Sequence, residues 1–367
     1  MDNPQAKLAI GLMSGTSRDG IDAALIETDG EGAVAAVEFH AMAYDNGFRL
    51  RLAEACQRAM AMERPGFEPL IAAVEVELTE YHVQAVADLL GRSGHIAEDV
   101  GVIGFHGHTV AHRPDRGWTW QIGDGAALAG AFGIAVVGDL RSADVAAGGQ
   151  GAPLLPVYHR ALAAGLDKPA AILNLGGVAN ITFIGSDDGL IAFDTGMASG
   201  LIDNWMQTHG HAPFDAGGAC AARGQVDEAR LTAMMADPWF DLAPPKSIDR
   251  EAFSIAAVQG LTLEDGAATL TAFTAAAVAR ALTHVPETPR QIHVAGGGRH
   301  NATLMAMIAA RTGVEVLDVD DLGWDGDALE AQGFAYMAVR HLKGLPISFP
   351  GTTGAPEPLT GGVLFRP

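Results

Sequence analysis

The chain has 367 residues, of which 49% are hydrophobic and 46 are glycine, and its formal net charge is −21 at pH 7. The apolar content argues against disorder, and the charge argues against nucleic-acid and anionic-membrane partners, whose binding surfaces would have to form against the global field. Because one hydrophobic core rarely supports this length, we expect two domains with a cleft for a small soluble substrate.

The first half of the chain has the pattern of short strands interrupted by helices. Apolar or alternating runs between turn residues predict an antiparallel meander, which two amphipathic helices and two buried strands follow. In chain order, the meander strands are residues 8–13, 21–27 and 33–43, the helices are residues 49–62 and 67–92, and the buried strands are residues 101–106 and 134–138.

The second half repeats this plan, with strands joined by tight turns and then helices. The repetition predicts two related α/β units. The expected strands are residues 170–175, 178–184, 190–193, 291–295 and 314–319, and the expected helices are residues 263–285 and 327–342.

The glycine-rich segment at residues 148–156 is the expected boundary, although such a loop can equally belong to the functional site. We therefore expect a first domain over residues 1–150 and a second over residues 151–345. The C-terminal stretch, residues 346–367, lacks helical periodicity and is expected to pack back across the domains.

The start of the chain, MDNPQAK, has no basic region followed by an apolar stretch, so no secretory signal is expected. The longest uncharged apolar stretch, residues 125–138, is too short and too rich in glycine to span a bilayer. These observations predict a cytoplasmic protein. The two cysteines, Cys56 and Cys220, belong to no cluster with metal-ligand spacing and are expected to be buried thiols.

The stretch SGTSRDG, residues 14–20, places three hydroxyl side chains and unhindered backbone N–H groups at a turn between two predicted strands. Such a turn is equipped to cradle phosphate oxygens. It is not a Walker loop, because no GK[ST] follows and the next element is a strand. Read alone, it is also compatible with an ordinary hairpin turn.

Further glycine-rich turns favour a nucleotide site. LNLGGVANIT, residues 173–182, is a second hairpin turn with two glycines between two asparagines. AGGGRHN, residues 295–301, ends a strand and is expected to open a helix, whose N-terminal N–H groups favour an anion or the polar edge of a nucleotide. A carbohydrate-binding module explains these turns poorly.

Seven motifs together resemble one family. GLMSGTSRDGID, HGHT, QIGD, GDLRSADVAAGGQGAPLLP, LNLGGVANIT, FDTG and AGGGRHN occur in the order and approximate spacing of the anhydro-N-acetylmuramic acid kinase family, from Gly11 to the TTGA stretch at Thr352. The resemblance implies an α/β fold of two related actin/hexokinase-like (ribonuclease H-like) domains that close over ATP in an interdomain cleft. It also implies that the chain is an ATP-dependent sugar kinase of peptidoglycan recycling, and a possible homodimer.

The reaction implied by the resemblance converts ATP, water and 1,6-anhydro-N-acetylmuramic acid into ADP and N-acetylmuramic acid 6-phosphate. Since O6 is held in the internal acetal, water must open the bridge at C1 before O6 can attack the γ-phosphoryl group. A carboxylate must activate that water. In FDTG the family's base corresponds to Asp194, which without the resemblance is more simply read as a turn aspartate.

The resemblance also assigns binding residues. Arg141 can clamp a carboxylate or a phosphate with its planar fork, or it can pair with Asp139 or Asp144. His106 and His108 are expected to donate or accept hydrogen bonds rather than to bind a metal, because no third ligand is near in sequence. Mg²⁺ is implied by the phosphoryl chemistry, with ligands unassigned. The implied sugar-binding residues are Ser14, Asp19, His106, Asp124 and Arg141, and the implied ATP-binding residues are Gly15, Thr16, Ser17, Arg18, Asp19, Gly20, Ile21, Asp22, Gly176, Gly177, Asn180, Gly296, Gly297 and Gly298.

Several positions depart from the family's pattern. The family's FDTGPGN ends here in Met-Ala-Ser at residues 197–199, which changes the allowed turn conformations and shortens a hydrogen-bonding side chain. Glutamine is usual at His108, a hydrophobic residue at Arg18 and proline at Gly125. These changes cluster around the expected sugar site.

Three readings of the function therefore stay open. The chain keeps the family's activity with a rearranged pocket, or it is a divergent paralogue that phosphorylates another sugar while retaining Asp194. A non-catalytic ATP-binding switch of the same superfold is the third reading. Against it, the sequence has no obvious substrate-binding appendage or polymerisation insert.

Overall fold

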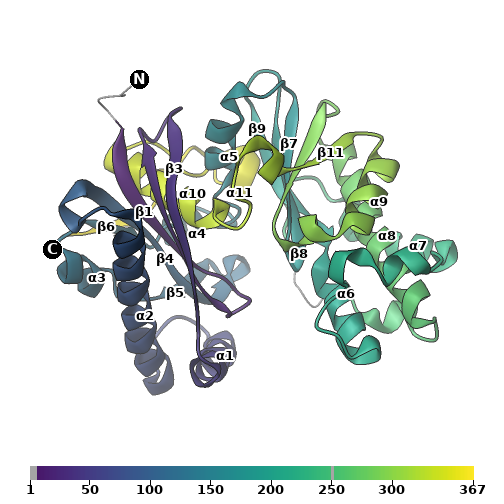
Figure 1. The fold of residues 1–367 in the computed structure, drawn as a ribbon, viewed down its shortest axis with the longest axis horizontal. Coiled ribbons are helices and arrows are strands. Elements are labelled where there is room, and N and C mark those ends of the chain that lie inside the picture. Colours follow the sequence, from purple (N-terminus) through teal and green to yellow (C-terminus); the bar gives the residue numbers. More distant parts are fainter. Residues whose placement is uncertain (1–5, 249–251) are drawn as a thin grey trace. The chain divides into compact units, whose positions relative to one another are not determined.

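The computed structural model describes residues 6–248 and 252–367, so the first five residues of the stretch read as lacking a signal lie outside it. The chain divides into two compact units, one formed by Met1–Ala164 with Ala328–Pro367 and the other by Gly165–Asp327. Each unit has its own sheet, and the α/β class expected from the sequence is confirmed (Figure 1).

A seven-stranded sheet forms the centre of the first unit. Its strands are β1 (Lys7–Ser14), β2 (Gly20–Thr28), β3 (Val34–Ala43), β4 (Val100–Arg113), β5 (Trp118–Ile122), β6 (Val136–Gly138) and β12 (Val363–Phe365). Their order is β12-β6-β4-β1-β2-β3, with β5 paired to β4. β1 to β3 form the predicted antiparallel meander, and β4 runs parallel to β1 and β6.

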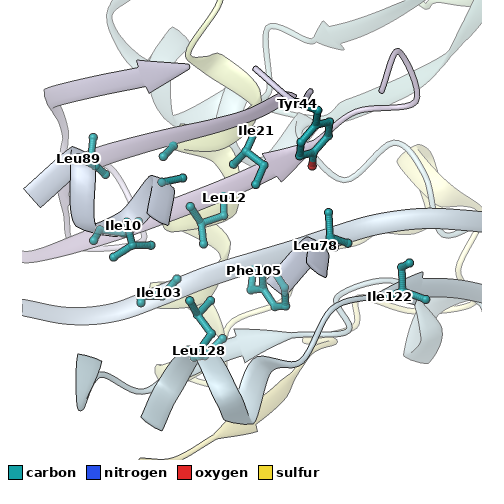
Figure 2. Close-up of a cluster of buried hydrophobic side chains, with 14 of the residues drawn as sticks. Ile10, Leu12, Ile21, Tyr44, Leu78, Leu89, Ile103, Phe105, Ile122 and Leu128 are labelled. Carbon is teal, nitrogen blue, oxygen red and sulfur yellow. The ribbon is translucent and has the colours of Figure 1, made fainter. Parts of the chain in front are cut away.

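Helices cover both faces of this sheet. They are α1 (Asn46–Ala61), α2 (Pro69–Ser93), α3 (Gly125–Phe132), α4 (Ser142–Ala146), α5 (Pro156–Leu162), α10 (Leu329–Leu342) and α11 (Pro350–Thr353). On one face Leu12 and Phe105 pack with Leu78 of α2 and Leu128 of α3 in a continuous apolar core (Figure 2). The two amphipathic helices predicted before β4 are confirmed as α1 and α2.

α10 covers the opposite face of the first sheet, where two glycines let it approach closely. Gly11 of β1 and Gly104 of β4 are register partners, and a Cβ at either position would overlap a carbonyl oxygen of α10, that of Ala331 or Phe334. The sequence pattern placed this helix in the second half. Its contacts with β1, β2 and β4 place it in the first unit, because the strands that it covers lie over 200 residues earlier in the chain.

The C-terminal stretch adds an edge strand to the same sheet. β12 pairs antiparallel with β6, with Val363 opposite Gly138. The contact-based units therefore differ from the expected boundaries at residues 150 and 345. Local pattern also missed β5 and α3, and it ended β4 at His106, whereas the strand continues to Arg113 through Gly107, whose φ is +67°.

The second unit repeats the same strand plan. Its strands are β7 (Ala170–Leu175), β8 (Val178–Ile184), β9 (Leu190–Met197), β10 (Gln291–Ala295) and β11 (Glu315–Asp318). The order β11-β10-β7-β8-β9 matches β6-β4-β1-β2-β3, with an antiparallel meander followed by two parallel strands. The duplication expected from the sequence is thus present in the topology.

Helices of the second unit are α6 (Ser199–Trp205), α7 (Glu228–Met235), α8 (Leu263–Ala281) and α9 (Ala302–Thr312). α8 is the long buried helix that the sequence predicted, and with α9 it packs on Leu173, Ile181 and Val294 of the sheet. Over residues 6–248 and 252–367, the structure contains no helix with the length and apolar character needed to cross a membrane.

Candidate active site

A row of polar side chains crosses three strands of the second sheet. Asn174 of β7 is the register partner of Asn180 of β8, and Asn180 is the partner of Asp194 of β9. Partners in adjacent strands carry their side chains on the same face. The residues around them in the strands are mostly buried and apolar, so this half-buried row is a polar exception in the sheet. It brings together two of the predicted residues, Asn180 and Asp194.

Asp194 is fixed by the segment 246–248. The backbone N–H of Ile248 donates to Asp194 Oδ2 at 2.9 Å, and the N–H of Asp194 donates to the Lys246 carbonyl at 3.0 Å. Burial raises the pKa of the Asp194 carboxyl to about 6, against the effect of the Ile248 N–H. Among the described residues no hydrogen bond reaches Oδ1, which is therefore available to a ligand or a water.

Lys246 anchors this segment and was missed by sequence reasoning. Its Nζ donates to the Phe240 carbonyl at 2.9 Å and lies 4.5 Å from the centroid of the Trp239 ring. The residue is 9% exposed, and burial lowers the pKa of its amine. The surrounding APPKSID carries no motif, so only the fold reveals that it positions Asp194.

The turn at Gly176 and Gly177 holds the start of α6. The N–H groups of Ala198 and Gly200 point to the Gly177 carbonyl at 3.0 and 3.2 Å, and the N–H of Ser199 donates to the Gly176 carbonyl at 3.0 Å. The resemblance implied that Gly176 and Gly177 of this turn bind ATP. The carbonyl groups of the turn are engaged within the fold, and because these contacts use backbone atoms they persist despite the altered side chains at 197–199.

The three consecutive glycines after β10 have different surroundings. A Cβ at Gly296, where φ is +78°, would overlap Asn174 Oδ1, and a Cβ at Gly298 would lie 2.6 Å from the Cβ of Leu175. Both glycines are therefore needed for packing on the end of β7. A Cβ at Gly297 would meet nothing within 4 Å, so this position is open to a ligand.

The stretch AGGGRHN ends β10 and leads into α9, as expected from the sequence. A short 3₁₀ turn follows Gly296, and α9 starts at Ala302. Its N-cap is Asn301, whose Oδ1 accepts the N–H of Leu304 at 2.9 Å. A side-chain cap thus satisfies one of the N–H groups at the helix N-terminus that the sequence had offered to an anion.

Arg299, which sequence reasoning did not single out, ties this loop to the end of β11. Its guanidinium contacts Asp327 at 2.8 Å and Asp318 and Asp320 at 3.5 Å each. The side chain is 3% exposed, and Gly326 leaves room for it because a Cβ there would lie 2.8 Å from the guanidinium carbon. The loop that contains the three glycines is therefore held by Arg299, a buried arginine that pairs with three carboxylates.

In the first unit, the loop between β1 and β2 is held by short-range hydrogen bonds. The N–H of Arg18 donates to the Gly15 carbonyl at 3.0 Å with Arg18 in the left-handed region, at φ +57°. Ser17 Oγ donates to Asp19 Oδ1 at 2.6 Å, and the Tyr44 N–H donates to the Asp19 carbonyl at 2.9 Å. We call residues 15–19 the hairpin loop, and its tip is solvent-exposed.

Two of the predicted ATP-binding residues beside the hairpin loop, Gly20 and Ile21, have roles in packing the fold. Ile21 is fully buried in the core of the first unit, so its side chain is withdrawn from any ligand. A Cβ at Gly20 would overlap the Met42 carbonyl, so this glycine allows the close pairing of β2 with β3. Thr16, Ser17 and Asp19 carry the exposed polar groups of the predicted phosphate loop.

Ser14 and His108 meet at the ends of β1 and β4 in a buried hydrogen-bonded chain. Ser14 Oγ lies 2.7 Å from the Tyr44 hydroxyl and 2.9 Å from His108 Nδ1, and His108 Nε2 lies 3.7 Å from Cys56 Sγ. Burial lowers the pKa of His108 to about 4, and Arg18 contributes to the shift. We call Ser14, Tyr44, Cys56 and His108 the thiol cluster; sequence reasoning missed its Tyr44. Of the two cysteines expected to be buried, Cys220 is buried and Cys56 is half-buried.

His106 orients Arg141. Arg141 Nε donates to His106 Nε2 at 3.1 Å, and His106 Nδ1 lies 2.8 Å from the Gly107 carbonyl. A guanidinium only donates and a carbonyl only accepts, so the ring must be neutral with its proton on Nδ1. Burial and Arg141 keep the pKa of His106 well below its usual value. Both ring nitrogens are engaged within the fold, one by Arg141 and the other by the Gly107 carbonyl.

Arg141 makes neither of the ion pairs considered from the sequence. Its Nη1 donates to the Gly151 carbonyl at 2.7 Å, while Asp144 instead accepts the Gly151 N–H and the Thr353 hydroxyl, each at 2.6 Å. No ion pair within the described ranges links Arg141 to Asp139 or Asp144. Burial lowers its pKa to about 10, opposed by Glu330 and Asp144.

Glu330 is the acidic neighbour of Arg141 that sequence reasoning missed. It lies in the first turn of α10, and burial raises the pKa of its carboxyl against the effect of Arg141. Because α10 is distant in sequence from β4 and α4, no spacing rule connects Glu330 with Arg141.

Asp124 caps a helix. Its Oδ1 accepts the N–H groups of Ala126 and Ala127 at 2.9 Å each at the start of α3, and the side chain is exposed. The proline usual at the next position would sit at the first helical residue, where proline is favoured. Here a Cβ at Gly125 would lie 2.6 Å from the ring of Phe365 in β12, which explains the glycine.

The described residues include no group of three or more His, Cys, Asp or Glu side chains arranged to hold a metal ion. A nucleotide-bound Mg²⁺ needs only one or two carboxylates besides phosphate oxygens and water. Asp19, exposed in the hairpin loop, has donor atoms of the required kind.

Residues 7–367 match the family described as anhydro-N-acetylmuramic acid kinase. A Rhizorhabdus wittichii protein named anhydro-N-acetylmuramic acid kinase is 63% identical over 361 residues, which are 98% of this chain and 99% of that protein. A Zymomonas mobilis protein of the same name is 54% identical over 359 residues, which are 97% of this chain and 98% of that protein.

Among solved structures, component A of (R)-2-hydroxyglutaryl-CoA dehydratase from Acidaminococcus fermentans has a TM-score of 0.51 at 12% identity. The match covers 91% of this chain and 98% of that one. At this identity the likeness concerns the fold alone. Together with the duplicated strand order, it agrees with the expected fold of two actin/hexokinase-like α/β domains.

Proposed function

Because this chain belongs to the anhydro-N-acetylmuramic acid kinase family, we propose that it uses ATP and water to open 1,6-anhydro-N-acetylmuramic acid and phosphorylate O6. The product is N-acetylmuramic acid 6-phosphate, and the setting is peptidoglycan recycling. The observation that carries the proposal is the state of Asp194. One of its oxygens is anchored by Ile248, the other is unengaged among the described residues, and its pKa is raised to about 6.

Asp194 is the proposed general base. A base acts best when its pKa is near the working pH, because it is then mostly ionised yet still a strong proton acceptor. Anchoring of Oδ2 aims Oδ1 at one place, where it takes a proton from the water that attacks C1. As C1–O6 breaks, O6 keeps the bonding electrons and attacks the γ-phosphorus, so ADP leaves and no separate acid is needed for O6.

The hairpin loop and the residues around Gly297 are the proposed ATP contacts. The hydroxyls of Thr16 and Ser17 are exposed, and Gly297 has no neighbour where a side chain would stand. Bound Mg²⁺, with Asp19 as a candidate ligand, would offset charge on the β- and γ-phosphates. Ile21, Gly20 and the carbonyls of Gly176 and Gly177 support the architecture of these loops instead.

Ser14, Asp124 and Arg141 are the proposed sugar contacts. Arg141 keeps one terminal nitrogen, Nη2, without a hydrogen bond among the described residues, and its charge is preserved at neutral pH by a pKa of about 10. A guanidinium in this state suits a carboxylate or a phosphate oxygen. His106 and Glu330 set its position and its electrostatic surroundings.

The decisive experiment is turnover with ATP and 1,6-anhydro-N-acetylmuramic acid in ¹⁸O-labelled water. We expect sugar-dependent ADP release and a product with one ¹⁸O at C1. If the chain turns over an ordinary hexose but not the anhydro sugar, it is a paralogue of different specificity. ATP binding without sugar-dependent ADP release identifies an ATP-binding switch. Label absent from the product excludes attack of water at C1.

A further inference from the structure

Arg18 has a fixed backbone and a charged side chain in the hairpin loop. Its N–H donates to the Gly15 carbonyl, and its own carbonyl accepts Arg49 Nε, both at 3.0 Å. The left-handed φ of +57° is uncommon for a residue with a side chain, and it decides where that side chain leaves the loop. The guanidinium is therefore presented from a rigid turn rather than from a flexible tip.

The side chain turns toward the thiol cluster. Arg18 acts electrostatically on both the Cys56 thiol of α1 and His108 of β4, so its guanidinium lies near these two groups. Cys56 and His108 are themselves in contact, and His108 is bonded to Ser14, a residue proposed to bind the sugar. The guanidinium thus lies on the side of the loop that faces α1 and β4, while Ser17 and Asp19 bond to each other.

Among the residues that the structure describes, no carboxylate forms an ion pair with this guanidinium. Ion pairs of the described residues engage many arginines, but none includes Arg18. Its neighbours in the thiol cluster are neutral at pH 7, because burial lowers the pKa of His108 to about 4 and raises that of the Cys56 thiol. The chain has a net charge of −21, and Arg18 is half-buried without a carboxylate partner among the described residues. Its guanidinium can therefore bind an anionic group of a ligand.

We propose that Arg18 is a specificity-determining residue that binds the carboxylate of the substrate's lactyl ether. This inference rests on the proposed function and reassigns Arg18 from the nucleotide to the sugar. It gives the lactyl carboxylate to Arg18 and leaves Arg141 to a phosphate oxygen or to uncharged oxygens of the sugar. Two of the chain's departures from the family pattern, Arg18 and His108, lie next to the same Cys56 thiol. His108 holds Ser14 and Cys56 in place, and Arg18 supplies the charge.

The test combines two changes, one in the protein and one in the substrate. Arg18→Gln removes the guanidinium, and Arg18→Leu places a hydrophobic residue where the family usually has one, so that variant is expected to fold. The methyl ester of the anhydro sugar removes the carboxylate charge. Arg51→Gln is the matched control, because Arg51 is an exposed arginine of α1 that is paired with Glu77.

For the unchanged chain, we expect the ester to have a KM about 10- to 100-fold higher than the acid, as a lost charge-assisted hydrogen bond predicts. In both Arg18 variants the KM of the acid rises by a similar factor, the ester is no longer distinguished from it, and the KM of ATP is unchanged. Arg51→Gln leaves the preference for the acid intact.

Three outcomes overturn the assignment. The first is that the variants still prefer the acid as strongly as the unchanged chain does. The second is that the KM values of acid and ester rise by the same factor, and the third is that only the KM of ATP rises. The last result would return Arg18 to the nucleotide phosphates. If the unchanged chain releases no ADP with the anhydro sugar, the proposed function itself fails and this inference fails with it.

Discussion

The N–H of Ile248 donates a hydrogen bond to Oδ2 of Asp194 at 2.9 Å, across 54 residues of sequence. The contact fixes one carboxylate oxygen and leaves the other without a partner among the described residues. It also limits the rise in the pKa of the carboxyl that burial produces. A buried carboxylate with a single anchor can be reactive and still have a defined orientation, and the first three predictions follow from that state.

Asp194→Asn removes the proposed base while keeping an oxygen that accepts the Ile248 N–H. We expect kcat to fall by about 10²- to 10⁴-fold, the range for loss of general-base catalysis, with little change in ATP affinity. Steady-state ADP release and nucleotide titration measure the two effects. Asp188→Asn, on an exposed turn, is the control and keeps full activity. Activity retained in Asp194→Asn would remove Asp194 from the mechanism.

The same variant is expected to be more stable. The pKa of the Asp194 carboxyl is about 6 in the folded chain against 3.8 as the reference value, so the folded state binds the proton more tightly. Stability therefore falls as pH rises from about 4 to 6 and is level above. Relative to the unchanged chain, Asp194→Asn gains up to about 3 kcal/mol of unfolding free energy at pH 7 and little at pH 4. Urea unfolding at both pH values measures the difference.

The pH dependence of catalysis follows from the same group. With its pKa raised to about 6 by burial, Asp194 must lose its proton before it can act, so kcat/KM rises about tenfold per pH unit below 6 and levels off above. Asp203 of α6 also has a pKa raised to about 6 by burial. The profile of Asp203→Asn must keep the inflection for Asp194 to be its source.

The local sequence pattern predicted the strands and helices that short-range interactions along the chain determine. The two meanders, α1, α2 and α8 follow from apolar alternation and helical periodicity, and FDTG marked Asp194 because the motif is contiguous. The sequence pattern did not reveal which residues contact them in the fold. Ile248, Lys246 and Glu330 reach the predicted residues through tertiary packing, and no spacing in the sequence encodes such contacts.

A glycine motif alone does not show whether its glycines serve packing or ligand binding. Gly296 and Gly298 stand in a stretch expected to contact the nucleotide, yet each lies where a Cβ would meet backbone or a neighbouring side chain. Of the three consecutive glycines after β10, Gly297 alone has nothing within 4 Å of its Cβ position. Glycine serves close packing and ligand approach with the same absence of a side chain, so the sequence cannot distinguish the two uses.

Gly104 tests the packing of α10 on the first sheet. A Cβ at this position would overlap the Phe334 carbonyl, so Gly104→Ala must push the helix away from β4. We expect a loss of about 1 to 3 kcal/mol of unfolding free energy or more. Gly91→Ala is the matched control, since Gly91 lies in α2 with nothing within 4 Å of its Cβ position, and it should gain about 0.5 to 1 kcal/mol.

Gly125→Pro restores the residue usual in the family at the first position of α3. The change breaks no hydrogen bond recorded for the described residues, because the Asp124 cap bonds Ala126 and Ala127. The added ring atoms would nevertheless collide with Phe365, whose ring is 2.6 Å from the Cβ position. We expect unfolding free energy to fall by about 1 to 3 kcal/mol.

A double-mutant cycle with Phe365→Ala isolates the cause of that loss. With the ring removed, Gly125→Pro should become neutral or stabilise by about 0.4 to 1 kcal/mol, because proline restricts the unfolded chain and suits the first helical position. The difference between the two backgrounds, measured by urea unfolding, is the coupling between residues 125 and 365. An equal loss in both backgrounds would place the conflict in the backbone of α3. A large coupling means that the C-terminal strand β12, which covers the start of α3, is the reason this chain departs from its family at Gly125.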